Sequence, residues 1–430
     1  MNNIRSKDDF LHRQQKFMNF PLVLAEMERP HLHIALPVLN EFLQLPEFLQ
    51  SLEHQQFSDF ELVVCVNQDD DWWNDAAKRE ICEDNKRSLS LLRQVQKFPV
   101  KVIDKSSPGR GWAAGKGGVG RARKTIMDAI AAAGSGQDVI VSMDADTNYP
   151  EDYLSIIAAC FRKNPKYYGL ALPYFHKLTG NEEHDRLILR YEIYMRYYAL
   201  NMIRINSPYR FSALGSAMAF PVWAYRKVGG LTPVQSGEDF YFLQKLVKSG
   251  PIGYTAPTTA YPSSRFSNRV NFGTGPALIK GRTGNWDSYP FFPAELFDKV
   301  EATFRLFPEL FEGDLSTPVD SFLRETFKTE HVWEPLRNNY KDRENFVKAC
   351  MNKMDGLRIL QFLKKGYSGD GRNLLPLIGF IRIYLPFAGA EEDLAKLEQK
   401  GFEHVDIEIL IHLRELFFRR EAQIRGYEKN

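Results

Sequence analysis

Short apolar runs alternate with longer segments of helical periodicity between residues 33 and 253. Runs of aliphatic and β-branched residues predict strands at 33–36, 61–66, 100–103, 138–143 and 168–172. Apolar positions at helical spacing predict helices at 42–52, 119–133, 150–162 and 182–205. Such alternation is typical of an α/β fold, in which ligands bind at the carboxyl ends of the strands.

The pattern changes after about residue 290, where strand signals disappear and Pro and Gly residues separate helical segments. We therefore predict a mixed, mostly parallel sheet followed by a C-terminal helical domain. The expected divisions are an N-terminal helical extension at 1–30, an α/β domain at 31–289 and a helical domain at 290–430.

The composition narrows the classes of function. A net charge of +2 over 430 residues gives no reason to expect a nucleic-acid partner. The four cysteines are widely spaced and suggest neither a zinc cluster nor a disulfide framework. The first 20 residues lack the apolar segment of a signal peptide, which favours a cytoplasmic location.

Two apolar segments bear on membrane contact. The longest, at 374–387, is short of the roughly 20 residues that a spanning helix needs. A predicted helix at 407–424 has Leu410, Leu413 and Phe417 on one side. Core packing is the favoured interpretation of that side, and peripheral contact with the inner face of a membrane is the alternative.

Two carboxylates follow the fourth predicted strand. Asp144 and Asp146 stand at alternate positions at its carboxyl end, so both can reach one ligand. Mg²⁺ and Mn²⁺ prefer such oxygen ligands and keep positions open for diphosphate oxygens. The alternative is ordinary helix capping before Pro150.

A second carboxylate pair, Glu238 and Asp239, follows Gly237 at the start of an amphipathic segment. A carboxylate at a helix N-terminus is stabilised as the anion and could accept a proton from a substrate hydroxyl. Helix capping again explains the pair without any chemistry.

The order of the motifs resembles glycosyltransferase family 2, whose members have the type A nucleotide-sugar fold. The resemblance covers roughly half of the chain. It runs through Ala35-Leu-Pro37-Val-Leu-Asn40-Glu41, Phe57-Ser-Asp-Phe-Glu61, Gly117-Gly-Val-Gly-Arg121-Ala-Arg123, Met143-Asp-Ala-Asp146, Leu214-Gly215-Ser-Ala-Met-Ala-Phe220, Val228-Gly229-Gly230 and Gly237-Glu238-Asp239.

The resemblance implies a transferase that uses a nucleotide diphosphate sugar and a divalent metal, Mg²⁺ or Mn²⁺. It implies that Asp146 is the principal metal ligand, that Asp144 contacts the ribose or the metal, and that Asp239 is the catalytic base with Glu238 beside it. Pro37 falls in the first motif, at the expected nucleotide site.

The chain departs from the family pattern at several places. Val66-Asn67 stands where many members have two aspartates, and the Asn67 amide can still bond a base edge. The Gln-X-X-Arg-Trp motif of processive synthases is missing, which argues against long-chain synthesis. Arg265 and Arg269 lie in its place and could contact the diphosphate.

The segment Gly115-Lys116-Gly-Gly-Val-Gly120 resembles an ATPase phosphate loop. Arg121 and Ala122 replace the Lys and the Ser or Thr that such a loop needs, and no buried strand precedes it. We interpret it as a flexible loop near the diphosphate, with Lys116 as a cation.

Several alternatives remain open. A retaining transferase of the same fold is compatible with the motifs, which do not specify stereochemistry. A nucleotidyltransferase would need a Gly-rich loop where Pro37-Val-Leu-Asn40 stands. A catalytically inactive nucleotide-sugar-binding scaffold is disfavoured because all four carboxylates are present. The motifs do not identify the donor sugar, the nucleobase or the acceptor, which could be a sugar, a lipid-linked molecule or a small molecule.

Overall fold

A seven-stranded sheet forms the centre of the computed structural model, which describes residues 30–254, 257–266, 273–385 and 390–426. The strand order is β3-β2-β1-β4-β6-β5-β7, and only β6 runs antiparallel to its neighbours. The strands are β1 (Leu32–Val38), β2 (Phe60–Asn67), β3 (Val100–Lys105), β4 (Val139–Ser142), β5 (Gly169–Ala171), β6 (Met218–Pro221) and β7 (Ile252–Gly253).

Helices cover both faces of the sheet. The side chains of β1 alternate: Ile34 packs in a cluster with α2 and α5, whereas Ala35 packs with α4 on the opposite face. The helices of this part are α2 (Leu45–Glu53), α3 (Arg79–Leu92), α4 (Val119–Ala133), α5 (Tyr153–Lys163), α6 (Glu182–Arg204), α7 (Val222–Lys227) and α8 (Glu238–Ser249).

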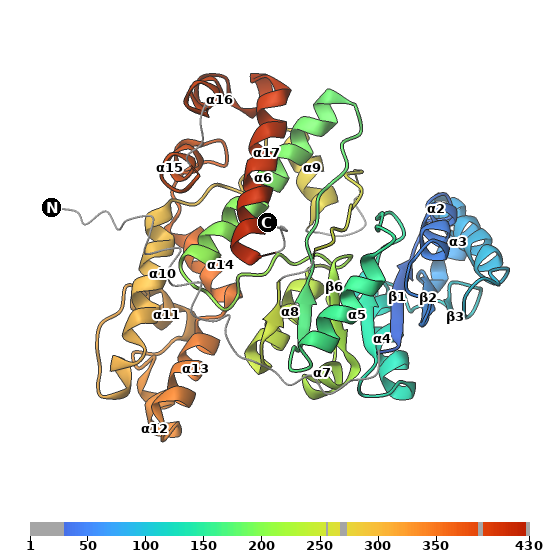
Figure 1. The fold of residues 1–430 in the computed structure, drawn as a ribbon, viewed down its shortest axis with the longest axis horizontal. Coiled ribbons are helices and arrows are strands. Elements are labelled where there is room, and N and C mark those ends of the chain that lie inside the picture. Colours follow the sequence, from blue (N-terminus) through green and yellow to red (C-terminus); the bar gives the residue numbers. More distant parts are fainter. Residues whose placement is uncertain (1–29, 255–256, 267–272, 386–389, 427–430) are drawn as a thin grey trace.

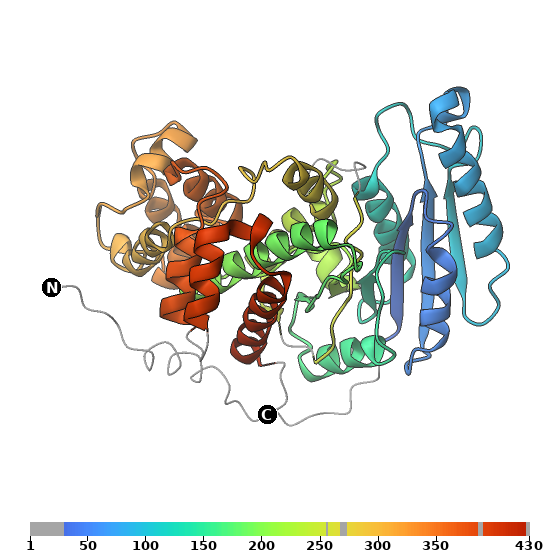
Figure 2. The same cartoon turned by 90° about the horizontal axis from the view of Figure 1, so that it is seen from above.

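The described residues after β7 form helices and no further strand. Figures 1 and 2 show β1–β3 at one end of the molecule and the helices α10–α13 at the other. These C-terminal helices are α9 (Thr274–Arg282), α10 (Ala294–Leu306), α11 (Asp320–Phe327), α12 (Glu334–Asn339), α13 (Arg343–Lys353), α14 (Gly356–Gly366), α15 (Leu375–Tyr384), α16 (Ala390–His404) and α17 (Ile407–Arg425). The predicted fold class is therefore confirmed.

Helix α6 packs lengthwise against α17, and one apolar cluster runs from the sheet into the C-terminal helices. Leu410, Leu413 and Phe417 of α17 are buried in that cluster. The alternative that this side of α17 rests on a membrane is thus wrong, because protein already covers it. Among the described residues, no helix is both long and apolar enough to cross a membrane.

A buried ionic network ties α6 to α17. Glu192 accepts hydrogen bonds from Arg196 at 2.6 Å and contacts His176 at 2.9 Å. Arg196 also donates to Glu421 of α17 at 2.9 Å. Burial alone would raise the pKa of Glu192, but Arg196 and His176 hold it at about 2. Glu192 and Arg196 therefore remain ionised at neutral pH within the core.

Candidate active site

A cavity of about 700 Å³ opens at the carboxyl ends of the central strands. Residues from the ends of β1, β2 and β4, the N-termini of α4, α8 and α9, and helix α14 line it. Among its lining residues are Pro37, Asn67, Asp144, Asp146, Glu238, Asp239 and Arg265. Two carboxylate pairs about a hundred residues apart in the sequence therefore face one space.

The first pair follows β4 as predicted from the sequence. The main-chain N–H of Asp144 donates to the Tyr149 hydroxyl at 3.1 Å, which fixes the turn that leaves the strand. The side chains of Asp144 and Asp146 are 33% and 20% exposed, so both remain accessible from the cavity. Their oxygens are a donor set that suits a hard divalent cation.

Arg123 of α4 connects this pair with the second one. Its guanidinium donates to Asp144 at 2.5 Å and to Glu238, and its Nε donates to the Ser142 hydroxyl at 3.1 Å. The side chain is only 3% exposed. Sequence analysis assigned Arg123 no role, because its partners are 19 to 115 residues away in the chain.

The second pair begins α8. Gly237 precedes it with φ of +75°, a left-handed conformation that glycine adopts without strain. Burial raises the pKa of Glu238 to about 7; Arg123 opposes this rise and Asp239 adds to it. Burial also raises the pKa of Asp239, while Arg123 and the Phe240 N–H lower it.

The two members of this pair occupy different positions. Glu238 is 3% exposed and bonded to Arg123, so it faces a fixed partner within the protein. Asp239 is partly exposed at the cavity, and its Oδ1 accepts from the N–H of Phe240 at 2.7 Å. Asp239 is therefore the member better placed to meet a substrate hydroxyl.

Asn67 ends β2 and is 1% exposed. Its Nδ2 donates to the carbonyl oxygen of Val38 at 2.9 Å, whereas its Oδ1 is buried without a hydrogen-bond partner. A buried polar atom left without a partner is costly, and a ligand N–H in the cavity would satisfy it. Pro37 lies nearby in β1 and also lines the cavity.

The predicted cations lie in different places. Arg265 donates to Glu41 and lies 2.8 Å from Asp146, so its guanidinium is bound to one of the predicted metal ligands. Lys116 is exposed and does not line the cavity. Arg269 falls outside the described residues.

Two glycines allow close packing beside the carboxylate pairs, Gly215 against Arg123 and Gly120 against Val234. A Cβ on Gly215 would lie 2.5 Å from the Arg123 guanidinium, and one on Gly120 would lie 2.3 Å from the Val234 carbonyl oxygen. Both glycines belong to motifs quoted for the family resemblance. Each permits an approach that any side chain would block.

Part of the cavity wall, from α6 and α14, was not predicted. Tyr191 and Tyr194 of α6 pack edge-to-face with Tyr289, and all three line the cavity. Helix α14 adds four residues to this wall: Leu357, Leu360, Gln361 and Lys364. Apolar periodicity marks such residues as core positions and does not reveal that a cavity adjoins them.

No protein-family model and no curated protein matches the chain. Two solved structures resemble it over nearly their whole lengths. S. aureus TarS 1–349 in complex with UDP-GlcNAc is 13% identical with a TM-score of 0.38, covering 92% of this chain and 90% of that one. The mannosyltransferase PcManGT from Pyrobaculum calidifontis, in complex with GDP-Man and Mn²⁺, is 12% identical with a TM-score of 0.39, covering 98% and 95%.

At identities and TM-scores this low, function has to be argued from the site itself. This chain itself has a sheet with a single antiparallel strand, helices on both faces and a cavity at the strand ends. Together they form a mixed α/β fold with both predicted carboxylate pairs on one cavity.

Proposed function

We propose that the chain is a glycosyltransferase that moves a sugar from a nucleotide diphosphate sugar to an acceptor hydroxyl. The observation that carries this proposal is the convergence of Asp144, Asp146, Glu238 and Asp239 on one cavity of about 700 Å³. That volume suits a small-molecule or cofactor ligand. The two pairs provide separate groups for metal binding, Asp144 and Asp146, and for proton transfer, Asp239.

Asp146, with Asp144, would hold Mg²⁺ or Mn²⁺. The fit rests on the cavity-facing carboxylates and on Arg265, which already places a positive charge 2.8 Å from Asp146. When bound, such a metal neutralises the charge that develops on a departing nucleoside diphosphate. Arg265 can then turn from Asp146 to phosphate oxygens, for which a guanidinium is well shaped.

The protein's own groups supply the remaining steps. Asn67 offers its unpartnered Oδ1 to a nucleobase N–H. Asp239 accepts the proton of the acceptor hydroxyl as that oxygen attacks the anomeric carbon, which gives inversion with a single protein base. Glu238 and Arg123 hold Asp144 and the start of α8 in place.

Ligand stabilisation is the first test of donor binding. A thermal-shift panel of UDP-sugars and GDP-sugars should raise the Tm only with Mg²⁺ or Mn²⁺ present, because bound ligand stabilises the folded state. Asp146→Ala should abolish the metal-dependent part of the shift. Unchanged nucleotide affinity in that variant, with and without metal, would refute the metal assignment.

Turnover separates the base from the binding residues. Asp239→Asn should bind donor and metal normally, while turnover falls by at least about a hundredfold. If Asp239→Asn turns over nearly normally, or loses donor binding as Asp146→Ala does, then Asp239 is not the base.

A further inference from the structure

A second group of metal-ligating side chains lies at the amino ends of the strands, away from the cavity. His31 immediately precedes β1 and His33 is the second residue of that strand, and their ring centroids lie 4.7 Å apart. Glu61 of β2 stands directly opposite His33 in the sheet register. One ligand atom from each of the three lies within 4.8 Å of the others.

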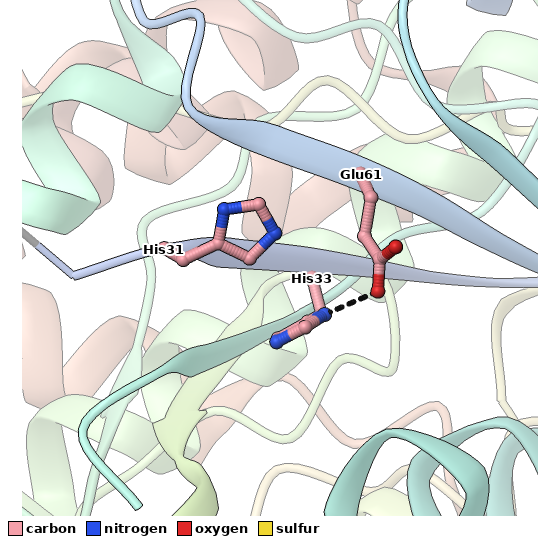
Figure 3. A group of neighbouring side chains, drawn as sticks. All are labelled: His31, His33 and Glu61. Atoms are coloured by element: carbon pink, nitrogen blue, oxygen red, sulfur yellow. Dashed lines mark hydrogen bonds and ion pairs between the residues drawn. The ribbon is translucent and has the colours of Figure 1, made fainter. Parts of the chain in front are cut away.

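Both histidines are oriented by carboxylates outside this group. The Nδ1 of His31 lies 2.6 Å from Asp59, and the Nε2 of His33 lies 3.1 Å from Asp138. Figure 3 shows a ring nitrogen of His31 turned toward His33 and Glu61. Metal-binding histidines commonly have a carboxylate on the second ring nitrogen, which fixes the tautomer and the ring.

The charges of the cluster favour a cation. Asp59, Glu61 and Asp138 contribute three negative charges, and Lys101, at 2.8 Å from Glu61, contributes one positive charge. These four charged groups together leave two negative charges in excess. Lys101 is 63% exposed, so its ammonium can withdraw into solvent when another cation takes its place.

We propose that His31, His33 and Glu61 form a binding site for a divalent transition-metal ion, with Zn²⁺ as the best match. Two imidazole nitrogens and one carboxylate oxygen are a common zinc set, with water as a fourth ligand. Ligand bonds of about 2.0–2.2 Å place tetrahedral ligands roughly 3.4 Å apart. Ligand atoms up to 4.8 Å apart would therefore close by up to about 1.4 Å, whereas His33 Nδ1 and Glu61 Oε1, now 2.7 Å apart, would separate by about 0.7 Å.

This site differs in chemistry from the cavity. The cavity offers carboxylate oxygens, which suit Mg²⁺ and Mn²⁺, whereas imidazole nitrogens select Zn²⁺ over those ions. A metal here would join β1 to β2 where the described chain begins. The inference does not depend on the proposed reaction.

Isothermal titration calorimetry tests the proposal. The full chain is stripped of metal and then titrated with Zn²⁺. The Asp146→Ala background removes the cavity as a competing site. We expect one Zn²⁺ per chain and a rise in Tm, because a metal bound to the folded state stabilises it. His31→Ala should weaken binding by more than about tenfold, since loss even of an outer partner costs 10–100-fold.

His331→Ala is the matched control, because His331 is an exposed histidine 2.7 Å from a carboxylate, Glu334, outside the cluster. It should bind Zn²⁺ like the parent. His31 is 33% exposed, so its replacement is expected to preserve the fold, and Glu61→Gln provides a second variant if it does not.

Co²⁺ bound in place of Zn²⁺ should show the visible absorption of a four-coordinate ion. Loss of that absorption in His31→Ala would identify the same ligands by a second readout. Failure to bind Zn²⁺, or equal affinity in His31→Ala and the parent, would overturn the proposal. Stability that depends on pH without any Zn²⁺ binding would mean that the cluster is only a set of ion pairs.

Discussion

Replacing Glu238 with Gln should change how the stability of the protein depends on pH. In the folded state burial raises the pKa of Glu238 from 4.5 to about 7, and its side chain is 4% exposed. A raised pKa means that the folded state binds the proton more tightly than the unfolded state. The resulting stabilisation is present below pH 4.5 and is lost as the pH rises through 7.

The size of the effect follows from these two values. Proton linkage with pKa values of 4.5 and about 7 gives a loss of about 2.5 kcal/mol between pH 5 and pH 8. A chain of 430 residues unfolds with an entropy of about 0.9 kcal/mol/K, so the Tm shift is about 3 °C. A Gln side chain is uncharged at every pH between 5 and 8, as Glu238 is when it is protonated. The Glu238→Gln variant should therefore not lose this stabilisation as the pH rises.

Scanning calorimetry at pH 5 and pH 8 measures the difference. The wild type and Glu238→Gln should unfold within about 1 °C of each other at pH 5, and the variant should be about 3 °C more stable at pH 8. Glu183→Gln, at a side chain that is 74% exposed, should follow the wild type at both values. Equal pH dependence in Glu238→Gln and the wild type would refute the reasoning, because other titrating groups are common to both proteins.

Three further outcomes are expected. Gly215→Ala should destabilise the protein by about 1–3 kcal/mol in urea unfolding, because the new methyl group would clash with Arg123; unchanged stability would contradict that packing. Asn67→Ala should weaken nucleoside diphosphate binding on the order of tenfold in calorimetry, with metal affinity preserved. Lys364→Ala should leave donor hydrolysis intact while raising the KM for the acceptor, since Lys364 lines the cavity from α14 and belongs to neither carboxylate pair. Loss of donor hydrolysis in that variant would place a catalytic role on α14.

Local sequence patterns were sufficient to predict the elements whose own residues show a clear apolar run or helical periodicity. The predicted helix at 119–133 coincides with α4, and the run at 138–143 contains β4 (Val139–Ser142). The β4 prediction was enough to place Asp144 and Asp146 at a strand end. Gly237 likewise marked the start of α8 and so the position of Asp239.

Other elements depend on tertiary contacts that local patterns do not contain. Strands β6 and β7 have four and two residues, and they are extended because they pair with β4 and β5. Helix α3 was missed because polar residues such as Asp84 and Asn85 occupy buried positions on it. The role of Arg123 follows from the fold, since it depends on Glu238 lying beside it 115 residues later.

The packing of α6 against α17 also has a consequence for biosynthesis. The ion pair between Arg196 and Glu421 spans 225 residues. At about 5–20 residues per second, a ribosome needs roughly 11–45 s to make the intervening chain. During that interval the face of α6 that packs against α17 is uncovered. Arg196 also lacks Glu421, one of its carboxylate partners.

Helix α6 also carries Tyr191 and Tyr194 of the cavity wall. The wall of the proposed site is therefore expected to remain incomplete until α17 has been made, even though both carboxylate pairs emerge earlier. Completion of the proposed site is expected to follow synthesis of α17, and a nascent chain held before residue 407 should be a substrate for chaperones.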